Sequence, residues 1–192
     1  MTADSPLDTP IFTGRLIRLC PPRAEDAEQF AAWSADDVYM RLLDDDPVRP
    51  QSAANFAHFA EVGNGASGDS YYFHIRALDD DALLGFVVLF DLKWRNGSAA
   101  LAIGIGDASR RGQGYGSDAL RVILTYAFHE LMLYRVGLTV LAYNTAAIRA
   151  YERVGFVQEG TIRGAVVRGG QRCDLLCYGI LREEWTAGGE ID

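Results

Sequence analysis

Several features that would place this chain in a special class of proteins are missing from its sequence. No apolar run approaches the roughly 20 residues that a membrane-spanning helix needs, and Met1–Pro6 has neither the basic residues nor the apolar segment of a signal peptide. Cysteine is scarce: Cys20, Cys173 and Cys177 are an odd number and do not form a disulfide framework. We therefore expect a cytoplasmic protein that binds no membrane.

Positive charge is also in short supply. Lysine and arginine together number 18 against 26 aspartates and glutamates, which gives a net charge of −8. A general nucleic-acid binder normally presents a basic face, so this balance argues against nucleic acid as a partner.

A metal site is not expected either. Cys173 and Cys177 are four residues apart on a predicted strand, which places them on one face, but no histidine lies near them in the sequence. His58 and His129 fall on predicted helices without partner ligands, and His74 lies on a predicted strand as a core or edge residue. Buried, reduced thiols are the better interpretation of the two strand cysteines.

The remaining composition is that of an ordinary globular domain. With 49% hydrophobic and 23% charged residues, the 192-residue chain is long enough to bury a substantial core as one domain. We expect that domain to cover residues 11–185, with loose tails at residues 1–10 and 186–192. No internal repeat, linker or low-complexity tract divides it.

Hydrophobic periodicity predicts a mixture of strands and helices. Alternating or continuous apolar runs predict strands at residues 11–19, 70–77, 82–90, 99–105, 135–142, 156–167 and 172–181. Apolar residues at three- and four-residue steps predict helices at residues 24–34, 53–60, 117–131 and 145–154, with a loop or broken helix at residues 36–50. The fold class is therefore α+β with a mixed sheet.

The stretch Ala99–Leu131 carries the clearest functional signal. It reads as a buried strand, a basic glycine-rich turn at Arg110–Gly116, and a helix with one apolar stripe. Glycines remove side chains that would block a ligand, and the first N–H groups of a helix lack partners within it, so the turn is a candidate phosphate site. The alternative is a tight turn that merely needs glycine dihedrals. An isolated glycine in the strand, Gly104, predicts a β-bulge.

Two common nucleotide-binding loops do not fit this turn. A Walker A loop needs lysine followed by serine or threonine after its second glycine, and that dipeptide is absent. A dinucleotide fingerprint needs a third glycine, but Gly104-Ile105-Gly106 is followed by Ser109, and Gly112-Gln113-Gly114 by Ser117. Both interpretations are excluded.

A third kind of loop matches. Arg111–Gly116 resembles the Q/R-x-x-G-x-G/A signature of the GNAT superfamily of acyl-CoA-dependent N-acyltransferases. Asn144–Phe156 resembles the N-x-x-A-x-x-x-Y-x-x-x-G-F segment of the same family. Residues 11–33 and Leu181–Trp185 are similar to the branch of ribosomal-protein-alanine N-acetyltransferases and spermidine acetyltransferases. The resemblance implies a mostly antiparallel, seven-stranded sheet flanked by about four helices, and acetyl-CoA as co-substrate without a metal.

The resemblance also implies where acetyl-CoA binds. The pyrophosphate would lie on the turn, the pantetheine arm would pair with the preceding strand like an added strand, and an asparagine would contact the cofactor. The residues concerned are Ile103, Gly104, Ile105, Arg110, Arg111, Gly112, Gln113, Gly114, Tyr115, Gly116, Ser117 and Asn144. Asn144 is also placed to cap the helix at residues 145–154.

Two residues are candidates for the chemistry. By resemblance, Tyr151 is the acid that protonates the departing thiolate; its alternative role is that of a core aromatic residue. Many family members carry a glutamate as base at the start of the strand before the turn, where this chain has Ser98-Ala99-Ala100. Asp91, just after a buried strand, is the substitute base, acting directly or through water; a solvated turn residue is the alternative.

The acceptor is predicted only as a class. Asp44, Asp45 and Asp46 lie in a region that lines the acceptor cleft of this family, so they either attract a cationic amine or form a solvated loop. We expect direct transfer of acetyl to a primary amine of a protein N-terminus, a polyamine or another small molecule. The alternative is a non-catalytic acyl-CoA-binding or regulatory module on the same fold. A homodimer is compatible with this branch, in which dimers are common.

Overall fold

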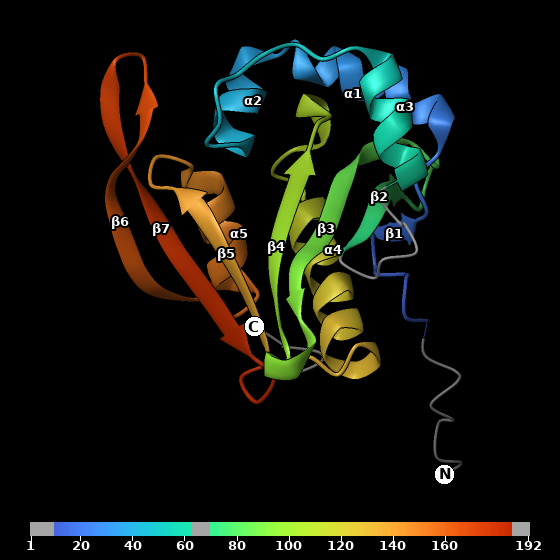
Figure 1. The fold of residues 1–192 in the computed structure, drawn as a ribbon. Coiled ribbons are helices and arrows are strands. Elements are labelled where there is room, and N and C mark those ends of the chain that lie inside the picture. Colours follow the sequence, from blue (N-terminus) through green and yellow to red (C-terminus); the bar gives the residue numbers. More distant parts are fainter. Residues whose placement is uncertain (1–9, 63–69, 186–192) are drawn as a thin grey trace.

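The computed structural model describes residues 10–62 and 70–185, which form an α+β fold around one seven-stranded sheet (Figure 1). The strands are ordered β1-β2-β3-β4-β5-β7-β6, and among these strands β4 and β5 are the one parallel pair. The predicted mostly antiparallel sheet is therefore confirmed. Its strands are β1 (Ile17–Cys20), β2 (Tyr71–Ala77), β3 (Leu83–Lys93), β4 (Ser98–Ile105), β5 (Arg135–Leu141), β6 (Val157–Arg168) and β7 (Gln171–Leu181).

Helices lie on both sides of the sheet. In Figure 1, α1, α2 and α3 lie across one end of it, whereas α4 lies behind β3 and β4. The predicted apolar stripe of α4 is confirmed, because its residues Leu120 and Leu124 are at most 1% exposed. A π-helical turn continues this helix over Tyr126–Glu130. The α-helices of the described ranges are α1 (Ala27–Ser34), α2 (Asp37–Leu43), α3 (Ala53–Val62), α4 (Tyr115–Thr125) and α5 (Thr145–Arg153).

The sheet divides between β4 and β5. These strands pair only where Ser98–Ala100 lies opposite Arg135–Gly137. Beyond this point β4 stays paired with β3 as far as Ile105, and β5 stays paired with β7 as far as Leu141. The two strands diverge as Figure 1 shows, so one edge of the β4 backbone is left unpaired from Leu101 onward.

Helix α2 is fastened to the β5 half of the divided sheet. Tyr143 Oη donates a hydrogen bond to Arg41 O at 2.7 Å, and Asn144 Nδ2 donates to Leu42 O at 3.0 Å. Both acceptors are carbonyls that the end of a helix leaves without intrahelical partners. The segment that follows β5 therefore holds the C-terminal end of α2 across the gap.

Two segments differ from their predicted structure. Periodicity predicts a first strand over residues 11–19, but β1 comprises only Ile17–Cys20. A turn precedes it, in which Gly14 N donates to Ile17 O at 2.8 Å, while the Asp118 carboxylate of α4 accepts from Leu16 N at 2.7 Å. These bonds take the chain out of an extended conformation. Residues 36–50 contain the helix α2, and the predicted tails lie outside the described residues apart from residue 10.

The cysteines are free thiols. Cys20 is buried, but Cys173 and Cys177 are half-buried on β7, so the prediction of buried thiols is wrong for this pair; Cys177 borders the pocket described below. Within residues 10–62 and 70–185, no group of three or more His, Cys, Asp or Glu side chains is arranged to hold a metal ion. No helix in this part of the chain is long and apolar enough to cross a membrane.

Candidate active site

A pocket of about 1010 Å³ occupies the gap between β4 and β5 and extends under α2. It brings the two sequence blocks together, because β4, the glycine-rich turn and α5 all contribute to its wall. Three of the predicted site residues, Gln113, Tyr115 and Asp91, are not part of the lining. The predicted residues that do line it are Ile103, Gly104, Ile105, Arg110, Arg111, Gly112, Gly114, Gly116, Ser117, Asn144 and Tyr151.

The turn between β4 and α4 presents a row of free backbone donors. Gly112 and Gly114 have φ angles of 76° and 93°, in the left-handed region that favours glycine. Within the described ranges, no acceptor is found for the backbone N–H of any residue from Gly112 to Ser117. The positive end of the α4 dipole lies at the same place. An anion is therefore the ligand that this turn suits.

The two arginines of the turn are already engaged by the protein. Arg110 donates to Tyr115 Oη at 3.0 Å and forms ion pairs with the turn Asp79–Asp80. Arg111 donates to the carbonyl oxygens of Ile105–Gly106 at 2.9 and 2.8 Å. The positive charge of both arginines lies beside the turn, but both guanidinium groups form bonds within the protein that stabilise the conformation of the turn.

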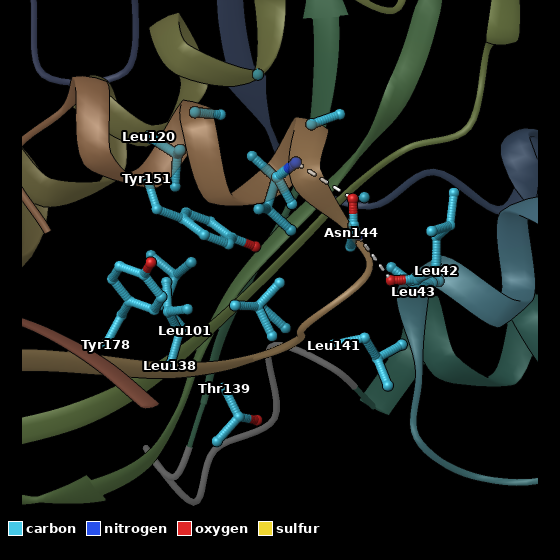
Figure 2. A pocket seen from close by; sticks show the side chains of 18 of the residues that line it. Leu42, Leu43, Leu101, Leu120, Leu138, Thr139, Leu141, Asn144, Tyr151 and Tyr178 are labelled. Carbon is cyan, nitrogen blue, oxygen red and sulfur yellow. Dashed lines mark hydrogen bonds between the residues drawn. The ribbon is translucent and has the colours of Figure 1, made fainter. Parts of the chain in front are cut away.

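Tyr151 extends from α5 into the pocket (Figure 2). The residue is 7% exposed; its ring packs against Phe156, and Leu101 and Leu138 lie beside it. Its hydroxyl has no hydrogen-bond partner in the described part of the chain, and burial raises the pKa of Tyr151 to about 12. At neutral pH a protonated hydroxyl therefore faces the pocket.

Asn144 caps α5 and also contacts α2. Its Oδ1 accepts from Ala147 N at 3.2 Å and its Nδ2 donates to Leu42 O, as Figure 2 shows. The predicted cap is confirmed. A contact between Asn144 and acetyl-CoA stays a prediction, and the amide that would make it is engaged by the protein at both ends.

The predicted base is not brought into the pocket. Asp91 is exposed near the end of β3 and pairs with Lys93 Nζ at 3.1 Å. Among the described residues, the carboxylates that line the pocket are Asp44–Asp45 and Glu159. Glu159 is paired with Arg135, which holds the pKa of Glu159 below its ordinary value.

A glycine is needed at position 104 because α2 packs closely against β4, and not because the strand bulges there. Phe86 and Gly104 pair without a register shift, so the prediction of a bulge there is wrong. A Cβ atom at Gly104 would lie 2.5 Å from Tyr39 Oη and 2.9 Å from both Leu43 Cδ1 and Phe86 Cε1. The missing side chain therefore leaves room for α2 to lie against β4.

Much of the pocket under α2 could not be predicted from the sequence. Its residues come from five elements and follow no local motif: Tyr39, Leu42 and Leu43 of α2, Phe86 and Phe90 of β3, Ala100 and Ala102 of β4, Thr139 and Leu141 of β5, and Leu175 and Cys177 of β7. The acids Asp44 and Asp45 follow α2 directly and were the one sequence signal for this half.

Comparison with known proteins agrees with this geometry. Residues 16–157 match the acetyltransferase (GNAT) domain family. The SPbeta prophage-derived uncharacterized N-acetyltransferase YokL of Bacillus subtilis (strain 168) is 29% identical over 174 residues, which cover 91% of this chain and 94% of that protein. The putative ribosomal N-acetyltransferase YdaF of the same organism is 34% identical over 108 residues, which cover 56% of this chain and 58% of that protein.

A solved structure shares the fold. Spermidine N-acetyltransferase from Vibrio cholerae, in complex with CoA and spermine, matches with a TM-score of 0.78 at 21% identity, covering 88% of this chain and 96% of that chain. The family match spans most of the described domain, and the relatives include a putative ribosomal N-acetyltransferase, in line with the branch that residues 11–33 and 181–185 resemble. The chain therefore belongs to the GNAT family of acetyl-CoA-dependent N-acetyltransferases.

Proposed function

We propose that this protein transfers the acetyl group of acetyl-CoA directly to a cationic amine that reacts in its neutral form. The observation that carries the proposal is that one pocket is lined both by four residues of the turn with free N–H groups and by Tyr151, whose hydroxyl has no partner in the described chain. The four turn residues are Gly112, Gly114, Gly116 and Ser117. The N–H row suits a pyrophosphate, and the hydroxyl suits the protonation of a leaving thiolate. In an acyl-CoA, the pyrophosphate and the thioester sulfur lie at opposite ends of the pantetheine arm. The gap between β4 and β5 connects the glycine-rich turn with Tyr151.

The free edge of β4 is the proposed partner of the pantetheine amides. Gly106 N donates to Leu84 O of β3 at 2.9 Å, and the polar groups of successive residues in a strand point to opposite edges. The peptide groups of Ile103 and Ile105 therefore face the gap. Arg111 binds Ile105 O from that side, which leaves Ile103 to pair with the arm.

Tyr151 acts as the acid in the proposed reaction. The neutral amine nitrogen attacks the thioester carbonyl carbon, a C–N bond forms, and the oxyanion then collapses with cleavage of the C–S bond. The nitrogen releases a proton to solvent, and the thiolate takes the Tyr151 proton, which water replaces. Since burial raises the pKa of Tyr151 to about 12, the acid is in its active form at neutral pH.

Asp91 remains a proposed base only through water. Its carboxylate is outside the pocket lining and paired with Lys93, so direct contact with the amine is not supported. Deprotonation of the amine by solvent is the simpler form of the proposal.

Direct transfer can be distinguished from an acyl-enzyme route at Cys177, the cysteine of the described chain that lines the pocket. We expect Cys177→Ser to keep most of the turnover, and initial rates with both substrates varied to show intersecting lines. Cys173→Ser, on the same strand outside the lining, is the matched control. A Cys177→Ser protein that folds but has lost turnover would contradict the direct route.

A cationic acceptor is proposed from the charge at the end of α2. Asp44 and Asp45 line the pocket, and Arg168 from the β6–β7 hairpin donates to the backbone oxygens Asp44 O and Asp46 O. The hairpin therefore holds this loop through its backbone. Asp44 Oδ1 accepts from Asp46 N at 3.1 Å, which leaves the other Asp44 oxygen and the Asp45 carboxylate to bind an amine. The related Vibrio cholerae structure contains spermine, which is a polycationic amine.

The decisive experiment measures free CoA released from acetyl-CoA with a panel of polyamines, amino-terminal peptides and small monoamines. We expect release with at least one cationic amine and an acetylated product of the matching mass. Tight binding of acetyl-CoA without release for any amine would instead favour the non-catalytic module.

The acidic loop is tested by Asp44→Asn and Asp45→Asn. A partly exposed ion pair contributes about 0.5–1 kcal/mol, so each substitution should raise the KM for the amine roughly two- to fivefold and leave the KM for acetyl-CoA unchanged. Asp37→Asn removes the same charge from α2 outside the lining and is the control. An unchanged amine KM in both pocket variants would dispose of this role.

A further inference from the structure

Helix α2 buries a tyrosine hydroxyl that has no partner. Tyr39 is 7% exposed, its Oη atom is fully buried, and it makes no hydrogen bond within residues 10–62 and 70–185. A buried hydroxyl that forms no hydrogen bond destabilises the folded protein, because its lost bonds to water are not replaced. Such groups are rare in folded proteins and call for a physical explanation.

The ring of Tyr39 is held in place from two sides. Asp36 caps α2 by accepting from Tyr39 N at 3.1 Å, which fixes the backbone. The Arg111 guanidinium lies over the ring at 4.9 Å from its centroid, and Arg111 is itself bonded to the carbonyl end of β4. The position of the hydroxyl is therefore set by the protein before any ligand binds.

The hydroxyl points at β4 where that strand borders the gap. Tyr39 lines the pocket, and its Oη lies 2.5 Å from the place where a Cβ of Gly104 would be. Because side chains alternate along a strand, Gly104 faces α2 whereas Leu101 faces α4 and Tyr151. Tyr39 and Tyr151 thus approach the gap from opposite faces of the sheet.

We propose that Tyr39 Oη donates a hydrogen bond to the thioester carbonyl oxygen of acetyl-CoA and to the oxyanion that forms from it. The inference rests on the proposed function, which places the thioester in the gap between the two tyrosines. Tyr39 is then a second catalytic residue: it stabilises charge on oxygen, while Tyr151 on the other face protonates sulfur.

The chemistry of the group agrees with this role. Burial raises the pKa of Tyr39 well above its ordinary value, although Arg111 opposes this shift, so the hydroxyl remains a donor across the working pH range. Tyr39 keeps its proton throughout. As the amine attacks, the carbonyl π electrons move to oxygen and the hydrogen bond strengthens; as the C–S bond breaks, those electrons return to the carbonyl.

The test compares activity with stability in Tyr39→Phe. Loss of one oxyanion donor costs on the order of 10²-fold in kcat, whereas the KM for acetyl-CoA and the dissociation constant of CoA should change less than about twofold. Because the hydroxyl bonds nothing in the protein, the melting temperature should stay the same or rise. Tyr134→Phe is the control at an exposed tyrosine outside the pocket, whose hydroxyl donates to Glu183 Oε1 at 3.3 Å. It should leave kcat, the KM for acetyl-CoA and the dissociation constant of CoA unchanged.

A second readout does not need turnover. The infrared carbonyl band of bound acetyl-CoA labelled with ¹³C at the thioester should lie at lower frequency in the wild type than in Tyr39→Phe, because a hydrogen bond weakens the C=O bond. An identical band in the two proteins, or an unchanged kcat, would overturn the inference. A raised amine KM with an unchanged band would make Tyr39 an acceptor contact instead. If the wild type binds acetyl-CoA but acetylates no amine, the proposed function fails, and the infrared comparison still decides the role of Tyr39.

Discussion

The proposed chemistry depends on two tyrosines, of which only Tyr151 belongs to a recognisable sequence motif. Tyr151 lies in a recognisable block, on a helix capped by Asn144, and its hydroxyl faces the pocket. Tyr39 lies in a short helix without a motif, and its hydroxyl is identified only by its lack of a partner. Both side chains are buried, and both therefore hold their protons more tightly than a solvated tyrosine.

Tyr151→Phe should lower kcat by roughly 10²-fold through loss of the general acid and leave the dissociation constant of CoA nearly unchanged. The pH dependence follows from the raised pKa. An acid with a pKa of about 12 is still roughly nine-tenths protonated at pH 11, so kcat/KM should rise as the amine deprotonates and should not fall again up to pH 10. Steady-state rates measure kcat and the pH dependence of kcat/KM, and calorimetric titrations measure the dissociation constant of CoA. If Tyr151→Phe lowered kcat and the affinity for CoA by the same factor, the role of Tyr151 would be purely structural.

Gly104→Ala should destabilise the protein by about 1–3 kcal/mol, the usual cost of overpacking. The new methyl group would meet Tyr39 Oη, Leu43 and Phe86. Tyr39→Phe removes the nearest of these atoms, so the double variant should recover part of the loss. Urea unfolding of the two single variants and the double variant measures this coupling, and strictly additive effects would mean that the hydroxyl does not lie over Gly104.

At the scale of elements, α2 is the part that completes the pocket. Its side chains touch β4, whereas its C-terminal carbonyls are bound by Tyr143 and Asn144 beyond β5. A helix of seven residues has little stability of its own, so these tertiary contacts decide where it lies.

Two substitutions of Asn144 separate its cap from its contact with α2. Asn144→Asp keeps the oxygen that accepts from Ala147 N but loses the donor to Leu42 O, so the free energy of unfolding should stay near that of the wild type while amide exchange in α2 becomes faster. Asn144→Ala loses both bonds and should also cost about 1 kcal/mol of stability. Hydrogen exchange measures the opening of α2, and urea unfolding measures the change in the free energy of unfolding. Unchanged exchange in Asn144→Asp would show that the Leu42 bond does not hold the helix.

At the scale of the whole molecule, a buried charge cluster joins the N-terminal helices to the sheet. Asp26, beside the start of α1, accepts from His74 Nδ1 at 2.7 Å and pairs with Arg76 of β2. Arg76 in turn donates to Asp81 O at 2.8 Å. Asp80, the residue before Asp81, pairs with Arg110 of the glycine-rich turn, so this cluster connects the first helices to the candidate site.

The cluster predicts how stability depends on pH. Burial lowers the pKa of His74, although Asp26 opposes the shift, so the folded protein favours neutral imidazole. The unfolded chain, with an ordinary histidine pKa near 6.5, then binds the proton first as the pH falls. The free energy of unfolding should therefore decrease between pH 7.5 and pH 5.5, and His74→Gln should show a smaller decrease. Urea titrations of both proteins at the two pH values test this. An equal decrease in the free energy of unfolding in the wild type and in His74→Gln would exclude His74 as the cause.

The fold and half of the site could be predicted because their signals are local. The signals are the apolar stripe that includes Leu120 and Leu124, the glycines Gly112 and Gly114, and the cap at Asn144. Each depends on residues within one or two helical turns of one another in the chain. Predictions failed where a distant contact intervened. The Asp118 carboxylate binds the backbone before β1 and so shortens the first strand. The packing of α2 against β4 explains why residue 104 is a glycine.

The candidate donor side could be predicted from the sequence, because a turn that suits phosphate needs only glycine dihedrals and a helix start that are adjacent in the chain. The half of the pocket under α2 depends on the tertiary structure. Tyr39, Phe86 and Thr139 meet only because β4 and β5 diverge after three paired residues and α2 spans the gap. That arrangement depends on contacts between residues far apart in the chain, such as Asn144 with Leu42, which no local pattern encodes.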